Sequence, residues 1–282
     1  MTAAPDTSPH GERVALHNYS RRTRRIVLIA AAAIFAAWLL GTPGGLWGKA
    51  DAVGYAICHR IPARSFHLHG HPLPLCARCT GIYMGVMAGA IVYGLSGRLR
   101  SGRLPPIRVL VVLGLFGLAI AADGINSYLS LFGFYSPVYE PNNTLRLITG
   151  MYAGLTMITI VLPVFNLSAW RRPDASAPLN GLKELVALCL IGAVMIAGVL
   201  LEVPVLLAAF ALLSVVGVVL MFMLIGGILF LALTRREAAA VRRRNLIVPA
   251  LAGLAFAFIV IGGIDMLRYA LTSTWDGFTF IE

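Results

Sequence analysis

Seven apolar stretches, each near the length that crosses a lipid bilayer, constrain this sequence more than any other feature. They occupy residues 26–47, 80–95, 107–126, 145–167, 182–203, 204–233 and 246–271. About 20 apolar residues in a helix span the hydrocarbon core, and a helix satisfies its own backbone hydrogen bonds there. We therefore predict an all-α fold, a polytopic transmembrane bundle of about seven spans.

Composition excludes the other broad classes. Hydrophobic residues make up 59% of the 282 residues and charged residues 12%, whereas soluble domains carry about 25% charged residues. The polar surface is too small to cover a water-soluble fold of this size. A soluble enzyme, a disordered protein and a disulfide-rich secreted domain are thereby ruled out.

The positive charge predicts how the chain lies in the membrane. Of the 23 Lys and Arg residues, five lie in the N-terminal tail, and four, three and five lie in the second, fourth and sixth connections between spans. The positive-inside rule places these segments in the cytoplasm. The N-terminus is then cytoplasmic and the C-terminus extracytoplasmic, in the inner (cell) membrane. The net charge of +11 thus points to the lipid bilayer as partner and not to nucleic acid.

Three regions follow from this pattern. Residues 1–25 read as a disordered basic cytoplasmic tail. Residues 26–168 form a membrane domain with an outer loop at 48–79, and residues 169–282 form an additional three-helix membrane module. No cleavable signal peptide is expected, because the first apolar run follows about 25 polar residues and lacks a cleavage site.

The outer loop carries three of the four cysteines. Cys76 and Cys79 form a Cys-x-x-Cys pair at the start of the second span, and Cys58 precedes them. Zinc takes four nitrogen or sulfur ligands, and Cys-x-x-Cys is a common half of such a site. We predict a metal site, zinc by default. Its candidate ligands are Cys58, His59, Cys76 and Cys79, with His67, His69 and His71, on one face of an extended segment, as alternatives.

Two other interpretations of these cysteines remain open. A Cys-x-x-Cys pair at a helix N-terminus has a lowered thiol pKa and could act in thiol–disulfide exchange. A single disulfide could instead staple the loop, leaving one thiol over. Cys189, in the middle of the fifth span, reads as a small buried hydrophobe.

Further polar residues lie at the outer ends of the spans, where ionisable groups suggest a functional site. The candidate catalytic residues are Asp123, Asn126 and Arg146. The candidate substrate-binding residues are Arg64, Ser65, Asn143, Thr149, Asp265 and Arg268. Glycines four residues apart, at 81, 85 and 89 and at 150 and 154, allow close helix packing. This packing would bring the cysteine pair beside Arg146.

Four separated motifs resemble an uncharacterised prokaryotic membrane-protein family, domain of unknown function 2085. They are CHRIPARSF at 58–66, PLCARCTGIYMG at 74–85, DGIN at 123–126 and NTLRLITG at 143–150. The resemblance covers about residues 45–155. Asn126 stands where the family tends to have glutamine. The resemblance implies a membrane protein but no activity.

The favoured interpretation is a metal site facing outward beside Asp, Arg and Asn side chains, with an unknown activity. A metal-dependent enzyme acting on a lipid or another phosphate-bearing substrate is the first hypothesis for that activity. Arg146, at a helix N-terminus, suits a phosphate or carboxylate. Three alternatives stay open. They are a membrane thiol–disulfide oxidoreductase, a transporter for an ion or small solute, and a structural protein with a stapled outer loop.

Overall fold

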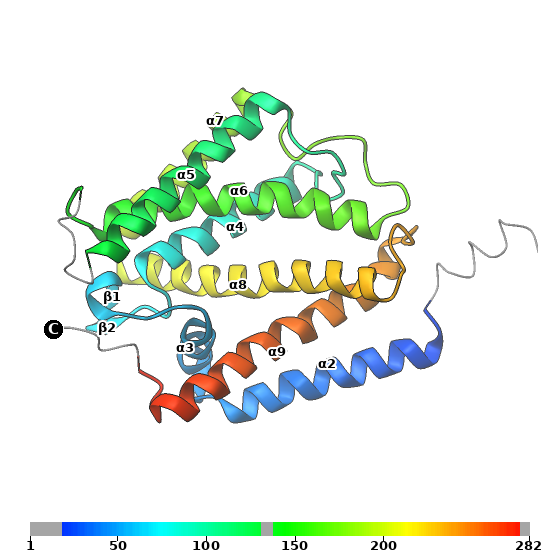
Figure 1. The fold of residues 1–282 in the computed structure, drawn as a ribbon, viewed down its shortest axis with the longest axis horizontal. Coiled ribbons are helices and arrows are strands. Elements are labelled where there is room, and N and C mark those ends of the chain that lie inside the picture. Colours follow the sequence, from blue (N-terminus) through cyan, green and yellow to red (C-terminus); the bar gives the residue numbers. More distant parts are fainter. Residues whose placement is uncertain (1–18, 131–137, 277–282) are drawn as a thin grey trace, which may run out of the picture.

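The computed structural model describes residues 19–130 and 138–276 and consists almost entirely of helices (Figure 1). The helices are α2 (Arg21–Gly41), α3 (Gly45–Ile57), α4 (Ala77–Leu95), α5 (Ile107–Leu129), α6 (Asn143–Ala169), α7 (Leu182–Leu200), α8 (Pro204–Leu233) and α9 (Ile247–Thr272). A hairpin of β1 (His67–Leu68) and β2 (His71–Pro72) precedes α4. Within these residues seven helices are long and apolar enough to cross a membrane. The predicted all-α bundle of seven spans is confirmed.

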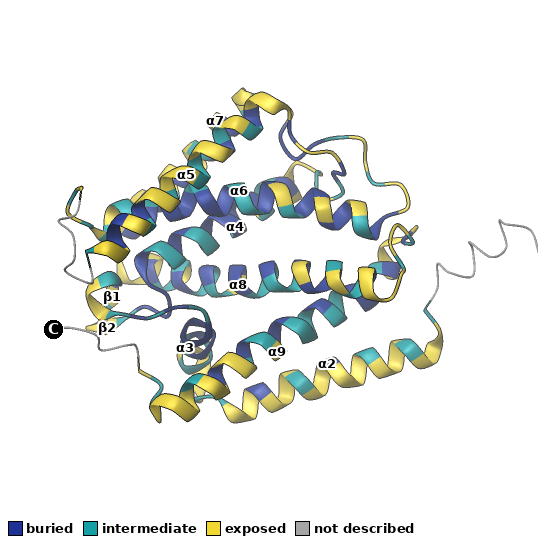
Figure 2. Cartoon of the chain, viewed as in Figure 1, coloured by how far each residue is buried: buried dark blue, intermediate teal, exposed yellow. Residues whose placement is uncertain are grey.

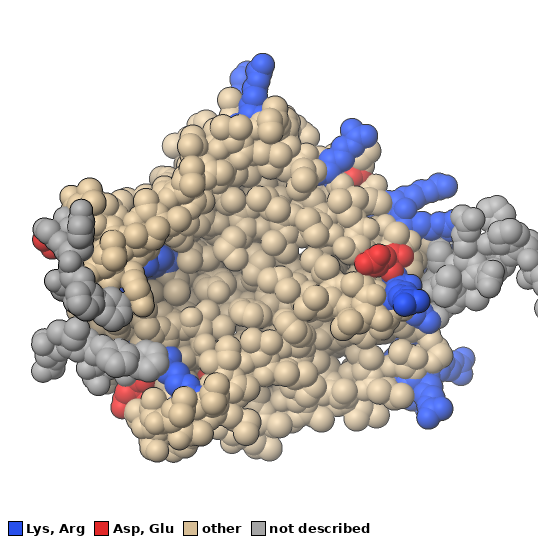
Figure 3. All heavy atoms as spheres, in the orientation of Figure 1, with Lys and Arg blue, Asp and Glu red and all other residues tan. Residues whose placement is uncertain are grey.

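The two ends of the bundle differ in chemistry. We call the end that carries α3, the hairpin and the three loop cysteines the cysteine end. The connections α4–α5, α6–α7 and α8–α9 lie at the other end, the basic end. Figure 3 shows most of the visible Lys and Arg side chains gathered away from α3 and the hairpin. That the basic end faces the cytoplasm remains a prediction of the positive-inside rule.

Helices α4 and α6 form the closely packed centre of the bundle (Figure 1). A Cβ atom added to Gly81 would fall on the carbonyl oxygen of Leu147, and one added to Gly154 would fall on that of Ile82. Only glycine lets the two backbones approach so closely. The expected packing of these glycine-containing helices is confirmed, and it sets the start of α4 beside the start of α6.

The first apolar stretch, predicted as one span over 26–47, is two helices. Helix α2 ends at Gly41 and α3 begins at Gly45. Pro43 lacks a backbone N–H and disfavours helical geometry in the residue before it, so the helix stops here. As a result α3 lies across the cysteine end, seen nearly end-on in Figure 1, and its last turn leads into Cys58.

The other end of α2 also differs from expectation. The helix begins at Arg21, where the Ser20 hydroxyl accepts a hydrogen bond from the Thr23 N–H (3.0 Å). The last five residues of the predicted tail are therefore helical. Residues 1–18 of that tail lie outside the described part of the chain.

The last three helices belong to the same bundle as the others. A Cβ atom on Gly217 of α8 would meet the carbonyl oxygen of Tyr83 on α4, and one on Gly253 of α9 would meet that of Met223 on α8. Figure 2 shows the buried residues concentrated on α4, α6 and α8, whereas α2 is mostly exposed. Helices α8 and α9 thus pack as part of the same bundle, and the division of the chain into a membrane domain and an additional module at residue 169 stays a prediction.

Candidate functional site

The three loop cysteines meet at the cysteine end. Cys58 follows α3, Cys76 caps the N-terminus of α4, and Cys79 lies in the first turn of α4. Their sulfur atoms all lie within 4.8 Å of one another. All three are free thiols, with Cys58 and Cys76 buried and Cys79 half-buried. We call them the three-thiol group.

Backbone and thiol hydrogen bonds converge on Cys58. Its Sγ accepts from the Cys76 N–H at 3.3 Å and from the Arg60 N–H at 3.5 Å. Hydrogen bonds from the thiols of Cys76 and Cys79 lower the pKa of Cys58, and the Arg60 N–H adds to this effect. The hydrogen bond to Cys58 raises the pKa of Cys76, so the lowered pKa expected for the Cys-x-x-Cys pair is found at Cys58 and not at Cys76. Donors aimed at a sulfur favour its thiolate, which is the form that binds metals and attacks disulfides.

No histidine joins the three-thiol group in the described residues. His59 turns aside, and its Nδ1 accepts a hydrogen bond from the Ile61 N–H (3.1 Å). The side chains of His67, His69 and His71 are exposed. The hairpin instead packs on the bundle through Phe66, just before β1, and Leu73, just after β2, which are both buried. Of the predicted Cys₃His ligands, the structure brings together the three cysteines.

Asp123 is the centre of a buried polar network beside this group. Its side chain is 1% exposed. Arg78 donates to Asp123 Oδ2 from Nε (3.1 Å) and also from Nη2. Tyr139 donates to Oδ1 at 2.9 Å, and the Thr149 hydroxyl lies 3.5 Å from Oδ2. The carboxylate is thus neutralised and fully bonded, so it joins α4, α5 and α6 and has little capacity left for a substrate.

Two other candidates also use their polar atoms internally. Asn126 donates from Nδ2 to the Tyr139 carbonyl (2.9 Å) and accepts at Oδ1 from the Val138 N–H (2.8 Å). It therefore holds Tyr139 against Asp123. The buried Ser65 hydroxyl donates to the Ile61 carbonyl at 3.1 Å. The side chains of Asn126 and Ser65 thus hold nearby backbone in place and have their polar atoms bonded within the protein.

Arg146 has spare hydrogen-bonding capacity. It is 5% exposed, and its Nη1 donates to Asn143 Oδ1 at 2.9 Å. Its Nε is buried without a hydrogen-bond partner. Asn143 in turn donates to the Ala63 carbonyl at 3.2 Å, which ties the cysteine loop to α6. A buried donor of this kind needs an acceptor.

Arg146 belongs to a group of cations around His59. Arg64, which donates to the Ser127 carbonyl at 3.1 Å, and Arg78 complete the group. Burial lowers the pKa of His59, and the charges of Arg64, Arg78 and Arg146 lower it further, against the opposing effect of Cys58. We call Arg64, Arg78 and Arg146 the arginine cluster. Asp123 offsets one of its three charges.

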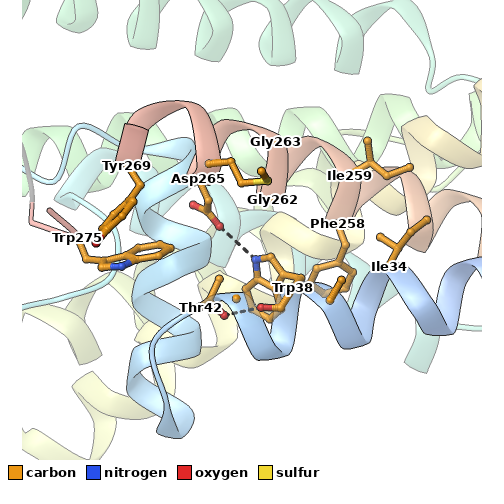
Figure 4. A pocket seen from close by; sticks show the side chains of 13 residues that line it. Ile34, Trp38, Thr42, Phe258, Ile259, Gly262, Gly263, Asp265, Tyr269 and Trp275 are labelled. Atoms are coloured by element: carbon orange, nitrogen blue, oxygen red, sulfur yellow. Dashed lines mark hydrogen bonds between the residues drawn. The ribbon is translucent and has the colours of Figure 1, made fainter. Parts of the chain in front are cut away.

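Asp265, expected at the same site, lies on the other flank of the bundle. Asp265 faces a pocket of about 580 Å³ between α2 and α9, where Trp38 Nε1 donates to its Oδ2 at 3.1 Å (Figure 4). Its Oδ1 is buried without a partner. Arg268 reaches inward, and its Nη1 donates to the carbonyl oxygens of Tyr55 (2.6 Å) and Cys58 (2.7 Å). Asp265 therefore lies apart from the Asp123 network, whereas Arg268 contacts the backbone of the segment that carries Cys58.

The contact that sequence reasoning missed is the one between Arg78 and Asp123. A carboxylate inside the membrane calls for a basic partner, and Arg78 is one of few arginines at this end. Its place between Cys76 and Cys79 drew attention to the thiols alone. Tyr139 and Trp38, which donate to the two buried aspartates, carry no recognisable sequence signal.

Comparison with known proteins locates the matched part of the chain. The profile of a family described as predicted membrane protein (DUF2085) matches residues 58–160. An uncharacterized protein of Methanocaldococcus jannaschii is 35% identical over 130 residues, which cover 45% of this chain and 77% of the relative. An uncharacterized protein of Methanothermobacter thermautotrophicus is 39% identical over 108 residues, 38% of this chain and 86% of the relative. No solved structure is significantly similar. The three-thiol group, Asp123 and Arg146 lie inside the matched residues.

Proposed function

This chain belongs to the DUF2085 family of predicted membrane proteins, and we propose that its three-thiol group binds a metal ion at the membrane surface. The observation that carries this proposal is the distance of at most 4.8 Å between any two of the three sulfur atoms. Zinc–sulfur bonds are about 2.3 Å long, so sulfur ligands of a tetrahedral zinc lie about 3.8 Å apart. Small side-chain rotations would bring the thiols to that spacing.

Charge supports a metal bound by thiolates. Three thiolates and one divalent cation carry a single net negative charge. Arg64 and Arg146 both lie within electrostatic range of Cys76, and Asp123 neutralises only one of the three arginines. Because uncompensated charge is costly near the hydrocarbon core, a negatively charged centre suits this position.

The fourth coordination position is where chemistry would occur. Structural zinc sites use four protein ligands, and catalytic sites use three with a water in the fourth position. A metal-bound water can lose a proton near neutral pH and become a nucleophile. We infer that the fourth position holds water or substrate, which makes the centre a candidate for metal-assisted hydrolysis.

The arginine cluster suggests the substrate class. The buried Nε of Arg146 lacks an acceptor, and guanidinium groups pair with phosphate through two parallel hydrogen bonds. A groove of about 660 Å³ is lined in part by Asn143, the hydrogen-bond partner of Arg146, but also by Glu202, and none of the three arginines lines it. We therefore propose that the arginine cluster itself binds the phosphate of a lipid, since the site lies at the ends of membrane spans. Under the positive-inside rule the site lies on the extracytoplasmic side of the cell membrane.

One observation also favours a second candidate, thiol–disulfide exchange. All three thiols are free and mutually close, and hydrogen bonds favour the thiolate of Cys58. Any two could form a disulfide after small movements, with transfer of two electrons to an acceptor.

Metal content and free-thiol count on the full chain, purified in detergent, separate the two candidates. We expect about one zinc per chain with protected thiols. Cys76→Ser and Cys79→Ser should lose the metal. The matched control Cys189→Ser, in α7 and outside the group, should keep it. A metal-free protein with one disulfide would overturn the metal proposal and support the exchange reaction.

A further inference from the structure

A second cavity, at the basic end, gathers arginines from separate parts of the chain. It has a volume of about 430 Å³ and is lined by Arg100 of the α4–α5 connection, Arg171 and Arg172 of the α6–α7 connection, and Ala240 and Val241 of the α8–α9 connection. Among the residues that the structure describes, the lining holds three arginines and no acidic residue, and Asp174, outside the lining, forms an ion pair with Arg100. The positive-inside rule explains why arginines lie at this end, but it does not require three of them to share a cavity.

Hydrogen bonds join the three connections into a fixed frame. The Arg171 N–H donates to the Ala240 carbonyl, and the Ala240 N–H donates to that of Ala169, both at 2.9 Å. Asn166 of α6 donates from Nδ2 to the Leu99 carbonyl at 2.9 Å, which anchors the α4–α5 connection. Arginines that serve only to set topology need no such frame.

Contacts with Trp170 and Arg172 fix the guanidinium group of Arg100 in place. Its guanidinium carbon lies 4.1 Å over the ring of Trp170, which is 3% exposed. Its Nη2 donates to the Arg172 carbonyl at 3.2 Å. Its Nε makes no hydrogen bond, and its ion pair with Asp174 Oδ1 is long, at 3.9 Å, and partly exposed. A planar guanidinium fixed by stacking loses little freedom when it binds a phosphate.

We propose that this cavity binds the phosphate of an anionic phospholipid in the leaflet at the basic end. Its depth supports a lipid headgroup, since Arg171 and Arg172 directly follow Trp170 and the last residue of α6, Ala169, a helix that crosses the membrane. Basic pockets between spans on the positively charged side of membrane proteins bind such headgroups.

The test is a lipid titration of the full-length protein in detergent, followed by native mass spectrometry. The probes are phosphatidylglycerol and phosphatidylcholine. We expect selective binding of phosphatidylglycerol, weakened about fivefold for each arginine removed, and so about 25-fold in the double variant Arg171→Gln/Arg172→Gln. The matched control Arg21→Gln/Arg22→Gln removes the same charge from the exposed start of α2 and should bind as the unaltered protein does.

Other outcomes would overturn the proposal. Equal weakening in the control would show diffuse attraction to charge. Displacement of the lipid by millimolar inorganic phosphate would show a site for a soluble phosphate. Arg100→Lys keeps the charge but loses the planar fork, so it should weaken binding. Because it also loses the contacts with Trp170 and the Arg172 carbonyl, binding is compared at a temperature at which both proteins are folded. Unchanged binding in that variant would contradict the role given to Arg100.

Discussion

Arg78 donates two hydrogen bonds to the carboxylate of Asp123 from a position between the two cysteines Cys76 and Cys79. The ion pair fixes the first turn of α4 against α5; that turn contains Cys79 and directly follows Cys76. The same side chain also donates to the Ser127 hydroxyl at 3.1 Å. The geometry of the three-thiol group therefore depends on a polar contact outside it.

Asp123→Asn should destabilise the protein by about 3 kcal/mol or more, because it leaves the Arg78 charge buried without its partner. Thermal unfolding in detergent measures this loss. The matched control is Glu184→Gln, which breaks the half-exposed Arg98–Glu184 pair at the basic end and should cost less than about 1 kcal/mol. Equal losses in the two variants would contradict the central role of Asp123. Metal content should fall in Asp123→Asn alone.

Much of the fold follows from local sequence patterns. Hydropathy predicts the seven spans, and the glycines of α4 and α6 predict the central helix pair, because both signals are local or periodic. Local and periodic signals do not show which helices are neighbours around the bundle. Asp123 and Asp265 both lie near the same end of their helices, so the sequence predicts that they share a site. Helices α5 and α9, however, lie on opposite flanks of the bundle (Figure 1).

The glycine contacts of the central pair predict a sharp difference between two alanine variants. In Gly154→Ala the new methyl group would collide with the Ile82 carbonyl, and the two helices must separate. We expect a loss of about 1–3 kcal/mol. In Gly114→Ala on α5 nothing lies within 4 Å, and alanine stabilises a helix by up to about 1 kcal/mol. Comparable unfolding temperatures for the two variants would count against the close α4–α6 contact.

The exposed histidines should not affect the metal. A variant with His67, His69 and His71 all changed to alanine should keep its zinc content, because these side chains lie on the outer face of the hairpin. Metal analysis after dialysis against a mild chelator checks this. Loss of zinc comparable to that in Cys76→Ser would show that the hairpin folds over the thiols when metal binds.

Trp38 and Asp265 should be energetically coupled. The indole N–H is the donor to Asp265 Oδ2 (Figure 4), and a hydrogen bond to a buried carboxylate contributes about 1–3 kcal/mol. Trp38→Phe should lower stability by about that amount in the unaltered protein and by much less in an Asp265→Asn background. Equal effects in both backgrounds would mean that Trp38 stabilises the protein only by packing on Phe258 (ring centroids 4.9 Å apart).

The orientation of the bundle decides which compartment the three-thiol group meets. The connections at the basic end carry most of the positive charge, so the cysteine end should lie outside the cytoplasm. Alkaline phosphatase, which folds only outside the cytoplasm, should be active when fused after Glu282 and inactive when inserted after Ser176 in the α6–α7 connection. The reverse pattern would place the thiols in the reducing cytoplasm, where disulfides rarely persist. Thiol–disulfide exchange would then lose its support, and the metal centre would stand as the remaining role for Cys58, Cys76 and Cys79.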